Sequence, residues 1–403
     1  MEVKLREKST NWKRTQLVNL AKNEKSSFVI GPFGSDLVQS DYRSSGVPVV
    51  FVRDIKRNKF KWKSNVYLTE DKAAQLHAHS VLPGDIIVTK MGLPPGIAAL
   101  YPYDMETGIV TADILRLRPN TDKVDPTFLC NYLNSYHITK QVHQRTAGQT
   151  RPKLTLADYK TIKINLPPLL EQKKIARILS TWDKSIETVE KLIENSKAQK
   201  KALMQQLLTG KRRLPGFDEE WKTIRLDDVL DGKKRKGKIV PTNDEKRGVA
   251  YIGSTSFNGD FGIYTDSSDA VICSPKDILV LWDGENAGKA TTGLSGAVSS
   301  TVVRCRIDES KANSRFITYN LLKDNYKVRA IREGSGIPHM PGDFEHWYHI
   351  NLPPLKEQQE IAAILTSTDK EIETLQQKLD YLKQEKKSLM QQILTGKRRV
   401  IIN

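Results

Sequence analysis

Two kinds of short stretch resemble catalytic motifs, but each departs from its pattern at a residue the chemistry requires. Asn165 and Asn351 each precede Leu-Pro-Pro-Leu, close to the Asp/Asn-Pro-Pro-Tyr/Phe motif of amino-methyltransferases. The extra leucine breaks the spacing and no aromatic residue follows. The stretch GENAGKAT at 284–291 resembles a phosphate-binding loop, but its glycines lie one residue too close and Ala290 replaces the magnesium-binding Ser/Thr. We therefore expect neither methyl transfer nor ATP binding in this chain.

Nuclease and metal chemistry are equally poorly supported. Glu220-Trp221-Lys222 contains the Glu-x-Lys of nucleases, but no suitably placed aspartate precedes it on a strand. The histidine pairs His77/His79 and His346/His349 lack the helical His-Glu-x-x-His context of a zinc site. The sequence thus predicts no catalytic residues, no metal site and a binding module.

The composition indicates what such a module binds. The 403 residues carry a formal net charge of +17, which attracts polyanions, nucleic acid above all. No apolar run approaches the roughly 18 residues of a membrane helix, and the N-terminus has no secretion signal. Cys130, Cys273 and Cys305 lie far apart, which excludes a disulfide framework and a cysteine-rich zinc site. We expect a cytoplasmic protein.

The chain is a tandem repeat. Residues 164–214 align without gaps on residues 350–400, with 30 identities in 51 positions. Fainter matches connect the preceding regions: 11–17 with 220–226, 46–52 with 248–254, 84–92 with 276–284, 108–118 with 296–306, and 148–152 with 334–338. The repeating unit is therefore a variable domain followed by a near-identical segment.

That near-identical segment predicts a long helix in each copy. Pro168 and Pro354 suit a first helical position, and the glutamate three residues later suits the positive end of the helix dipole. Gly210 and Gly396 supply the stop, and Lys-Arg-Arg after each faces the negative end. About 42 residues lie between these signals, or about 63 Å of helix.

Apolar residues recur every three or four positions along both helices, as in a coiled coil. The predicted seam consists of Ile175, Leu179, Trp182, Ile186, Val189, Ile193, Leu203, Leu207, Ile361, Leu365, Ile372, Leu375, Leu379, Leu382, Leu389 and Ile393. Such a seam also suits dimerisation between chains. Because each helix has an equivalent in its own chain and a globular domain between them, we expect antiparallel pairing within the chain.

Antiparallel pairing of two like units generates a pseudo-two-fold axis and places the variable domains near opposite ends of a rod. Duplex DNA has the same kind of symmetry, and its turns repeat every ~34 Å. The arrangement predicts a split DNA site with an unread gap set by the helices.

Four motifs resemble the specificity (S) subunit of type I restriction–modification systems, and the resemblance covers essentially the whole chain. They are IGPFGSDLVQSDYRSSGVPVV at 30–50, NLPPLxEQ before each helix, LMQQxLTGKRR closing each helix, and RLPGFDEEWK at 213–222. One departure is visible: the second domain has DGKKRKGKIVPTNDEKRG where a GPFGS copy is expected. The strand and loop there are therefore expected to differ, and the run at 233–238 is either phosphate-facing or a solvated turn.

The resemblance implies two target-recognition domains, each reading one half of a bipartite asymmetric DNA site. It implies that the helices set the gap and dock two methyltransferase (M) subunits, with restriction (R) subunits in the full complex. The resemblance also implies that S-adenosylmethionine, ATP and Mg belong to those partners, and that this chain needs no cofactor and catalyses nothing.

The predicted fold class is α/β: two α/β target-recognition domains separated by two long antiparallel coiled-coil helices, in a pseudo-two-fold tandem repeat. The predicted boundaries are 1–165 for domain 1, 166–213 for the central helix, 214–351 for domain 2 and 352–403 for the C-terminal helix. Within the domains, 126–135 and 313–325 are predicted helices.

Base-reading residues are expected on polar, basic loops, where Arg and Lys suit guanine, Asn and Gln suit adenine, and cations also bind phosphate. The predicted DNA-binding residues are Lys90, Arg145, Gln149, Arg151, Lys153, Lys289, Arg332, Ser335 and His339. Two rival functions remain open from sequence: a coiled-coil scaffold without DNA sequence preference, and a stand-alone enzyme acting on nucleic acid.

Overall fold

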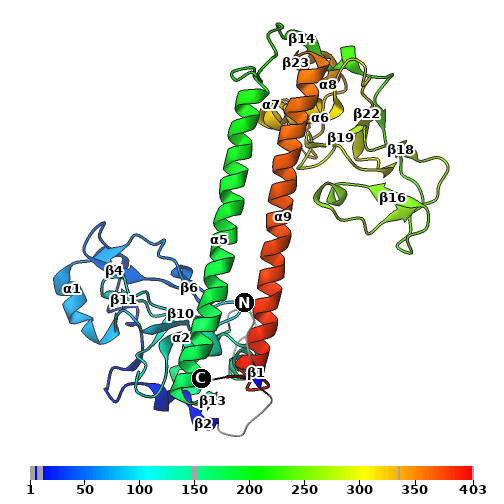
Figure 1. Cartoon of the computed structure of the whole chain (residues 1–403). Coiled ribbons are helices and arrows are strands. Elements are labelled where there is room, and N and C mark those ends of the chain that lie inside the picture. Colours follow the sequence, from blue (N-terminus) through cyan, green and yellow to red (C-terminus); the bar gives the residue numbers. More distant parts are fainter. Residues whose placement is uncertain (1–4, 7–11, 147–151, 335, 402–403) are drawn as a thin grey trace. The chain divides into compact units, whose positions relative to one another are not determined.

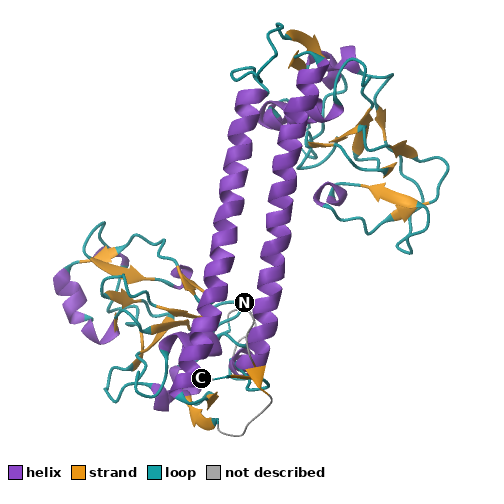
Figure 2. Ribbon diagram, in the orientation of Figure 1, coloured by secondary structure: helices purple, strands orange, loops and turns teal. Residues whose placement is uncertain are grey.

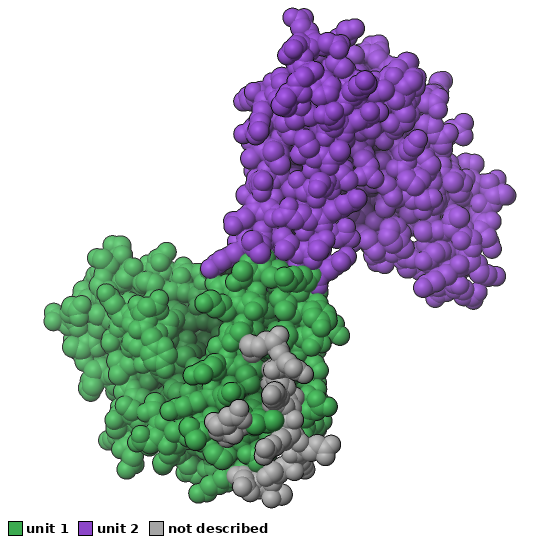
Figure 3. Space-filling model, in the orientation of Figure 1, with its two compact units in different colours: residues 1–189, 378–403 green, residues 190–377 purple. Residues whose placement is uncertain are grey.

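The computed structural model describes residues 5–6, 12–146, 152–334 and 336–401. The chain divides into two compact units, residues 1–189 with 378–403 and residues 190–377 (Figure 3). Each unit therefore contains one variable domain and part of both long helices. The division passes through these helices, so it does not test the predicted domain boundaries.

Unit 1 contains two four-stranded sheets (Figures 1 and 2). The first, antiparallel, has the order β10(Ala98–Leu100)-β9(Ile86–Thr89)-β12(Ile114–Leu117)-β3(Phe28–Ile30). The second has the order β7(Tyr67–Leu68)-β4(Val47–Val50)-β11(Gly108–Val110)-β8(Ser80–Val81), with β4 and β11 parallel. Three two-stranded pairs accompany them: β2(Lys13–Gln16) with β13(Lys163–Leu166), β5(Ile55–Lys56) with β6(Lys59–Phe60), and β1(Leu5–Arg6) with β24(Arg399–Val400).

Unit 2 repeats this topology. Its first sheet has the order β15(Arg235–Lys236)-β22(Val302–Cys305)-β19(Ile278–Leu281)-β20(Ala290–Thr291). Its second has the order β17(Tyr264–Thr265)-β16(Val249–Ile252)-β21(Gly296–Val298)-β18(Val271–Cys273), with β16 and β21 parallel. β14(Lys222–Arg225) pairs with β23(His349–Leu352), as β2 does with β13. The faint sequence matches therefore correspond to equivalent strands.

The short helices are α1(Glu70–Gln75), α2(Pro126–Leu133), α3(Tyr136–His143) and α4(Leu156–Lys160) in unit 1, and α6(Ser314–Lys323), α7(Asn325–Ala330) and α8(Phe344–Trp347) in unit 2. The predicted helices at 126–135 and 313–325 are confirmed as α2 and α6. Each is capped by a side-chain oxygen, Asp125 accepting from the Phe128 amide and Asn313 from the Phe316 amide.

The central strands of each first sheet are buried on both faces. In unit 1, Ile86 and Val88 of β9 pack with α2 and the start of the first long helix, whereas Ile87 packs with the second sheet. In unit 2, Ile278 likewise packs with α6 and the start of the second long helix, whereas Leu279 packs with the second sheet. Each domain is therefore layered, helices on a sheet on a second sheet, which explains the unbroken apolar runs DIIV and DILVL.

The two long helices, α5(Leu169–Leu207) and α9(Leu355–Ile393), each have 39 residues, slightly fewer than the 42 expected. Both begin directly after the second proline of Leu-Pro-Pro. Both end in a turn in which a glycine takes a positive φ, 69° at Gly210 and 70° at Gly396. The Arg212 amide then donates to the Gln206 carbonyl, and the Arg398 amide to Gln392, which satisfies carbonyls at the helix ends.

Candidate nucleic-acid interface

In unit 1, two of the segments predicted to bind DNA lie side by side. The Leu154 amide donates to the Lys90 carbonyl at 3.0 Å, and Met91 forms a β-bridge with Lys153. Lys90 is half-buried, with Nζ 3.2 Å from the Ala112 carbonyl, whereas Lys153 is exposed. The fold thus places Lys90 and Lys153 on neighbouring backbone segments.

Unit 2 builds the same junction from the equivalent segments. The Met340 amide donates to the Trp282 carbonyl at 2.9 Å, and the Gly284 amide to Pro338 at 2.8 Å. His339 forms β-bridges with Asp283 and Glu333. In both domains, therefore, the loop that follows a central strand of the first sheet, β9 or β19, meets the segment that precedes a short helix, α4 or α8.

The predicted residues of unit 2 are held mainly by neighbouring loops. Arg332 donates to the Arg329 and Glu285 carbonyls at 2.9 and 2.8 Å, and His339 Nε2 lies 3.5 Å from a Glu333 carboxylate oxygen. Lys289 Nζ lies 2.9 Å from Asn258 Oδ1. Arg332 therefore links the segment 332–340 to the loop 285–289. The sequence did not indicate this positioning role.

Arg145 lies apart from this junction, just beyond α3, and donates to the Gln141 carbonyl at 2.9 Å. It lines a cavity of about 510 Å³ with Arg14, His137, Gln141, Gln144, Lys163 and Asn165. Gln149, Arg151 and Ser335 lie outside the described residues. The DNA-binding assignments of all nine residues stay predictions.

The repeated helix ends contact each other, and this is the feature that sequence reasoning missed. In unit 1, Arg399 donates Nε to Glu171 Oε1 at 2.9 Å and also contacts Oε2. In unit 2, Arg213 donates Nε and a terminal nitrogen to the two Glu357 oxygens at 2.8 and 2.9 Å. Both glutamates are fully buried, and each hydrogen bond raises the pKa of its arginine.

Glu171 and Glu357 lie in the first turn of their helices, as the sequence predicts. The structure adds a contact that the sequence reasoning did not include: the glutamate that starts one helix pairs with the last arginine that follows the other. The signal was in the sequence: both residues recur 186 positions apart in both copies.

The tryptophans of the fainter repeat sit against the same ends. A β-carbon at Gly396 would lie 3.5 Å from the Trp12 ring, and one at Gly210 would lie 3.7 Å from Trp221. Trp221 Nε1 donates to Glu357 at 3.1 Å, whereas Trp12 Nε1 is buried without a hydrogen-bond partner among the described residues. The unit 2 cluster is therefore the more completely bonded of the two.

The glutamine of each Glu-Gln pair joins its helix to the adjoining domain. Gln172 accepts from the Asp125 amide at 2.8 Å and donates to the Pro167 and Lys123 carbonyls. Gln358 accepts from the Asn313 amide at 2.8 Å and donates to Pro353. Both side chains are buried, so each fixes the start of a long helix against the start of α2 or α6.

All sixteen predicted seam residues are buried or half-buried. Polar contacts link the helices within each unit: Asp183 with Lys386 at 2.5 Å in unit 1, and Asp369 with Lys200 at 2.5 Å in unit 2. Ser196 donates to Glu371 at 3.2 Å in unit 2. Together with the Glu171–Arg399 pair, each unit has two such contacts, and in both units the residue number on the second helix falls as that on the first rises. The helices therefore run antiparallel within each unit.

The described part of the chain contains no cluster of three or more His, Cys, Asp or Glu side chains arranged to hold a metal ion. No helix among the described residues is long and apolar enough to cross a membrane.

Comparison with known proteins identifies the family. The family model of the type I restriction modification DNA specificity domain matches residues 38–196 and 218–384. The chain belongs to this family. Each matched range contains most of one α/β domain and most of one long helix, so the repeat found in the sequence is a tandem pair of specificity domains.

Relatives and solved structures of this family resemble the chain over most of its length. The putative type I restriction enzyme MjaX specificity subunit of Methanocaldococcus jannaschii is 26% identical over 376 residues, covering 88% of both chains. The type I restriction–modification S subunit of M. genitalium has a TM-score of 0.62 at 14% identity, covering 97% of each chain. A chain from a type I R-M system has a TM-score of 0.58 at 20% identity, covering 96% and 99%.

Membership of this family confirms the predicted resemblance and the mixed α/β tandem architecture with long helices. The chain is a type I specificity subunit with two tandem specificity domains. A scaffold without DNA sequence preference is accordingly not favoured.

Proposed function

We propose that each domain of this specificity subunit reads one half of a bipartite, asymmetric sequence in double-stranded DNA. The observation that carries the proposal is the loop junction that recurs in both domains, Lys90 beside Leu154 and Trp282 beside Met340. The two junctions share a backbone arrangement but differ in side chains. Divergent loops on a shared frame are what two readers of different half-sites require.

The two long helices form an antiparallel coiled coil in this proposal, and their length sets the unread gap between the half-sites. Supporting it are the burial of the seam residues and the antiparallel contacts within each unit. A helix of 39 residues spans about 58 Å at 1.5 Å per residue, enough to separate two readers by more than one ~34 Å turn of DNA.

The chain itself is non-catalytic and requires no cofactor. The helices dock two methyltransferase subunits, which use S-adenosylmethionine to methylate adenine, and restriction subunits that use ATP and Mg join the complex. In support, the sequence patterns nearest to methyltransferase and ATP-binding motifs fail at required positions, and Asn165 and Asn351 lie in the strands β13 and β23 that precede the helices.

The proposal is tested by selecting duplexes from a randomised DNA pool with the purified complex of this chain and its methyltransferase. The expected product is two short specified elements separated by a fixed stretch of unspecified base pairs. A single uninterrupted element, or no enrichment over the starting pool, contradicts two separate readers.

A further inference from the structure

A basic cavity of about 710 Å³ lies in unit 2 beside strands β15, β18 and β22. Five cationic side chains line it, against one carboxylate, Asp269. The cations are Arg235, Lys236, Lys238, Arg304 and Arg306. Three of them belong to the basic run 233–238, whose role the sequence left open.

The sheet itself positions these charges. Arg235 of β15 lies directly opposite Arg304 of β22 in the antiparallel register. Gly237 follows and lies so close to β21 of the second sheet that a β-carbon there would be 2.1 Å from the Val298 carbonyl oxygen. Its amide donates to Val302 at 2.9 Å, which fixes the chain between Arg235 and Lys238.

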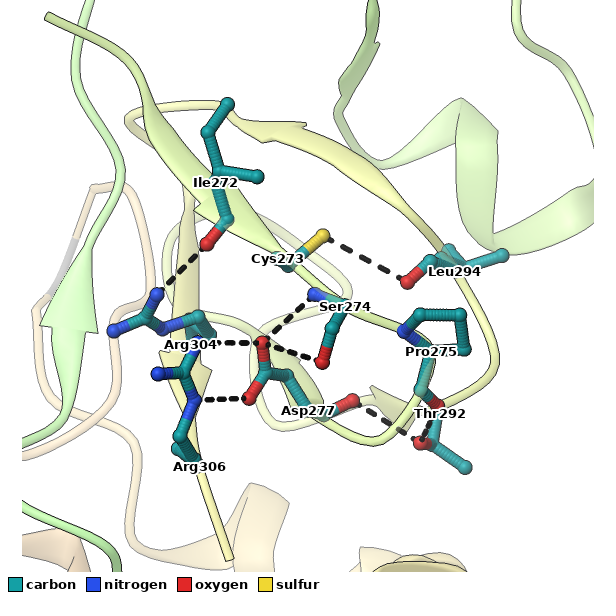
Figure 4. A network of polar contacts seen from close by, with 9 residues as sticks. All are labelled: Ile272, Cys273, Ser274, Pro275, Asp277, Thr292, Leu294, Arg304 and Arg306. Atoms are coloured by element: carbon teal, nitrogen blue, oxygen red, sulfur yellow. Dashed lines mark hydrogen bonds and ion pairs between the residues drawn. The ribbon is translucent and has the colours of Figure 1, made fainter.

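Two of the cations are already neutralised. Arg306 donates Nε to Asp277 at 3.0 Å, and Asp277 also accepts from the Ser274 amide and hydroxyl at 2.8 and 3.2 Å (Figure 4). Burial opposes ionisation of Asp277, but these hydrogen bonds outweigh it and its pKa is lowered. Lys236 pairs with Asp283 at 2.8 Å. Asp277 and Asp283 are thereby occupied.

The other three cations form no ion pair within the described part of the chain, although the charge of Asp277 also acts on Arg304. Arg304 is only 9% exposed and donates one hydrogen bond, to the Ile272 carbonyl at 2.7 Å, while its Nε has no partner among the described residues (Figure 4). Burial lowers its pKa and the charges of Arg306 and Arg235 add to this, whereas the charge of Asp277 opposes it. Arg235 and Lys238 are exposed and form no ion pair within the described part of the chain. A buried, incompletely bonded guanidinium beside two free cations is a site for an anion.

Unit 1 shows that the fold does not require these charges. Its equivalent strand β3 places Val29 opposite Arg116, and Arg116 is fully buried. Arg116 donates to the Ser26 and Ala78 carbonyls and lies 3.8 Å from Asp85. Arg116 Nε, like Arg304 Nε, has no hydrogen-bond partner among the described residues, but Arg116 donates two hydrogen bonds where Arg304 donates one. Unit 2 adds Arg235 and Lys238 beside its arginine and has a cavity there.

We propose that this cavity binds a phosphate of the DNA backbone, with Arg235, Lys238 and Arg304 as its ligands. The inference rests on the proposed function and adds a contact of the second domain that grips DNA without reading bases. Charge-assisted bonds from guanidinium and ammonium groups are the strong form of phosphate recognition, and phosphate contacts fix the register of a protein on the duplex.

The test compares the double variant Arg235→Gln/Lys238→Gln with wild type, each in complex with the methyltransferase, on the selected duplex and on an unrelated one. Loss of one phosphate contact reduces the salt slope of log K by about 0.9, or about fivefold in affinity near 0.15 M salt. We expect this loss on both duplexes, with their ratio unchanged. Arg304 is left in place because its removal risks the sheet.

The matched control is Lys246→Gln/Arg247→Gln, which removes the same charge from another exposed loop of unit 2. A loss of equal size in the control overturns the cavity assignment, because general charge would then explain it. A change confined to the selected duplex also overturns it, since that indicates base reading.

Inorganic phosphate, titrated calorimetrically into the chain, separates the two sources of this ligand. Phosphate binding that the double variant abolishes, with DNA affinity unchanged, contradicts a DNA contact and assigns the cavity to a free anion. Wild type that does not prefer the selected duplex contradicts the proposed function. If wild type prefers the selected duplex and the double variant binds DNA as tightly as wild type does, only the cavity assignment is contradicted.

Discussion

Strand β3 of unit 1 and strand β15 of unit 2 occupy the same position in equivalent sheets but carry different chemistry. Val29 and Ile30 of β3 are replaced by Arg235 and Lys236, as judged by their partners on β12 and β22. The glycine that follows is retained: a β-carbon at Gly31 or Gly237 would lie 2.1 Å from a backbone oxygen. The difference teaches that backbone contacts keep the sheet while side chains change the surface.

The helix ends teach the opposite lesson, because both copies keep the same residues and contacts. Glu171 meets Arg399 and Glu357 meets Arg213, each with the carboxylate fully buried. Segments retained in both copies fasten the helix ends, whereas the segments that differ are the ones we propose to contact DNA. The following predictions test this contrast.

The largest effect is expected at the helix ends. Arg213→Ala or Arg399→Ala leaves a fully buried glutamate without its partner, which costs about 3–5 kcal/mol of unfolding free energy. Urea unfolding measures the loss. Arg212→Ala and Arg398→Ala are the matched controls, because both side chains are exposed neighbours. Equal losses in the paired and control variants would show that the Glu171–Arg399 and Glu357–Arg213 pairs do not stabilise the helix ends.

A smaller and unequal effect is expected for the two equivalent sheet arginines. Arg116→Met deprives two buried carbonyls of their donor, at a cost of about 2–4 kcal/mol. Arg304→Met loses one such bond, so it costs about 1 kcal/mol or less. Chemical denaturation measures the stability loss of both variants. A larger loss for Arg304→Met than for Arg116→Met would contradict the interpretation that Arg304 is the less completely hydrogen-bonded of the two.

Next come the buried glutamines that join helix to domain. Gln172→Ala and Gln358→Ala each leave a backbone amide and a backbone carbonyl without a hydrogen-bond partner. We expect a cost of about 1–3 kcal/mol of unfolding free energy, similar in the two units. Hydrogen exchange at the Asp125 and Asn313 amides reports the local opening. Unchanged exchange at these amides would show that the glutamines do not hold the junction.

The smallest effect is expected along the helix seam. Lys200→Met and Lys386→Met remove ion pairs whose aspartates are 43% and 47% exposed at the side chain, so each changes stability by about 1 kcal/mol or less. Thermal unfolding measures the change. A loss as large as that of Arg213→Ala would mean that these pairs, rather than the helix ends, fasten the helices.

Local signals account for what the sequence predicted well. Proline starts, glycine stops and the asparagine and aspartate caps depend on neighbouring residues, so α2, α5, α6 and α9 appear close to their expected bounds. The heptad pattern likewise marked residues that are buried or half-buried. Central strands were visible as apolar runs because both of their faces are covered.

Contacts across long separations were not predictable from such signals. The Glu171–Arg399 pair joins residues 228 positions apart, and charge alone does not select a partner at that range. Strand β15 was hidden because a basic edge strand has no apolar alternation; its register comes from Gly237 and β22. The contact residues of the loops depend on side-chain direction, which spacing does not specify.

The most direct test of the central claim is a base-resolution map of N6-methyladenine in cells that co-express this chain and its methyltransferase. The account predicts a split motif, methylated on both strands and absent when this chain is omitted. Methylation of the same motif without this chain, or of one uninterrupted motif, would contradict two half-site readers carried on paired helices.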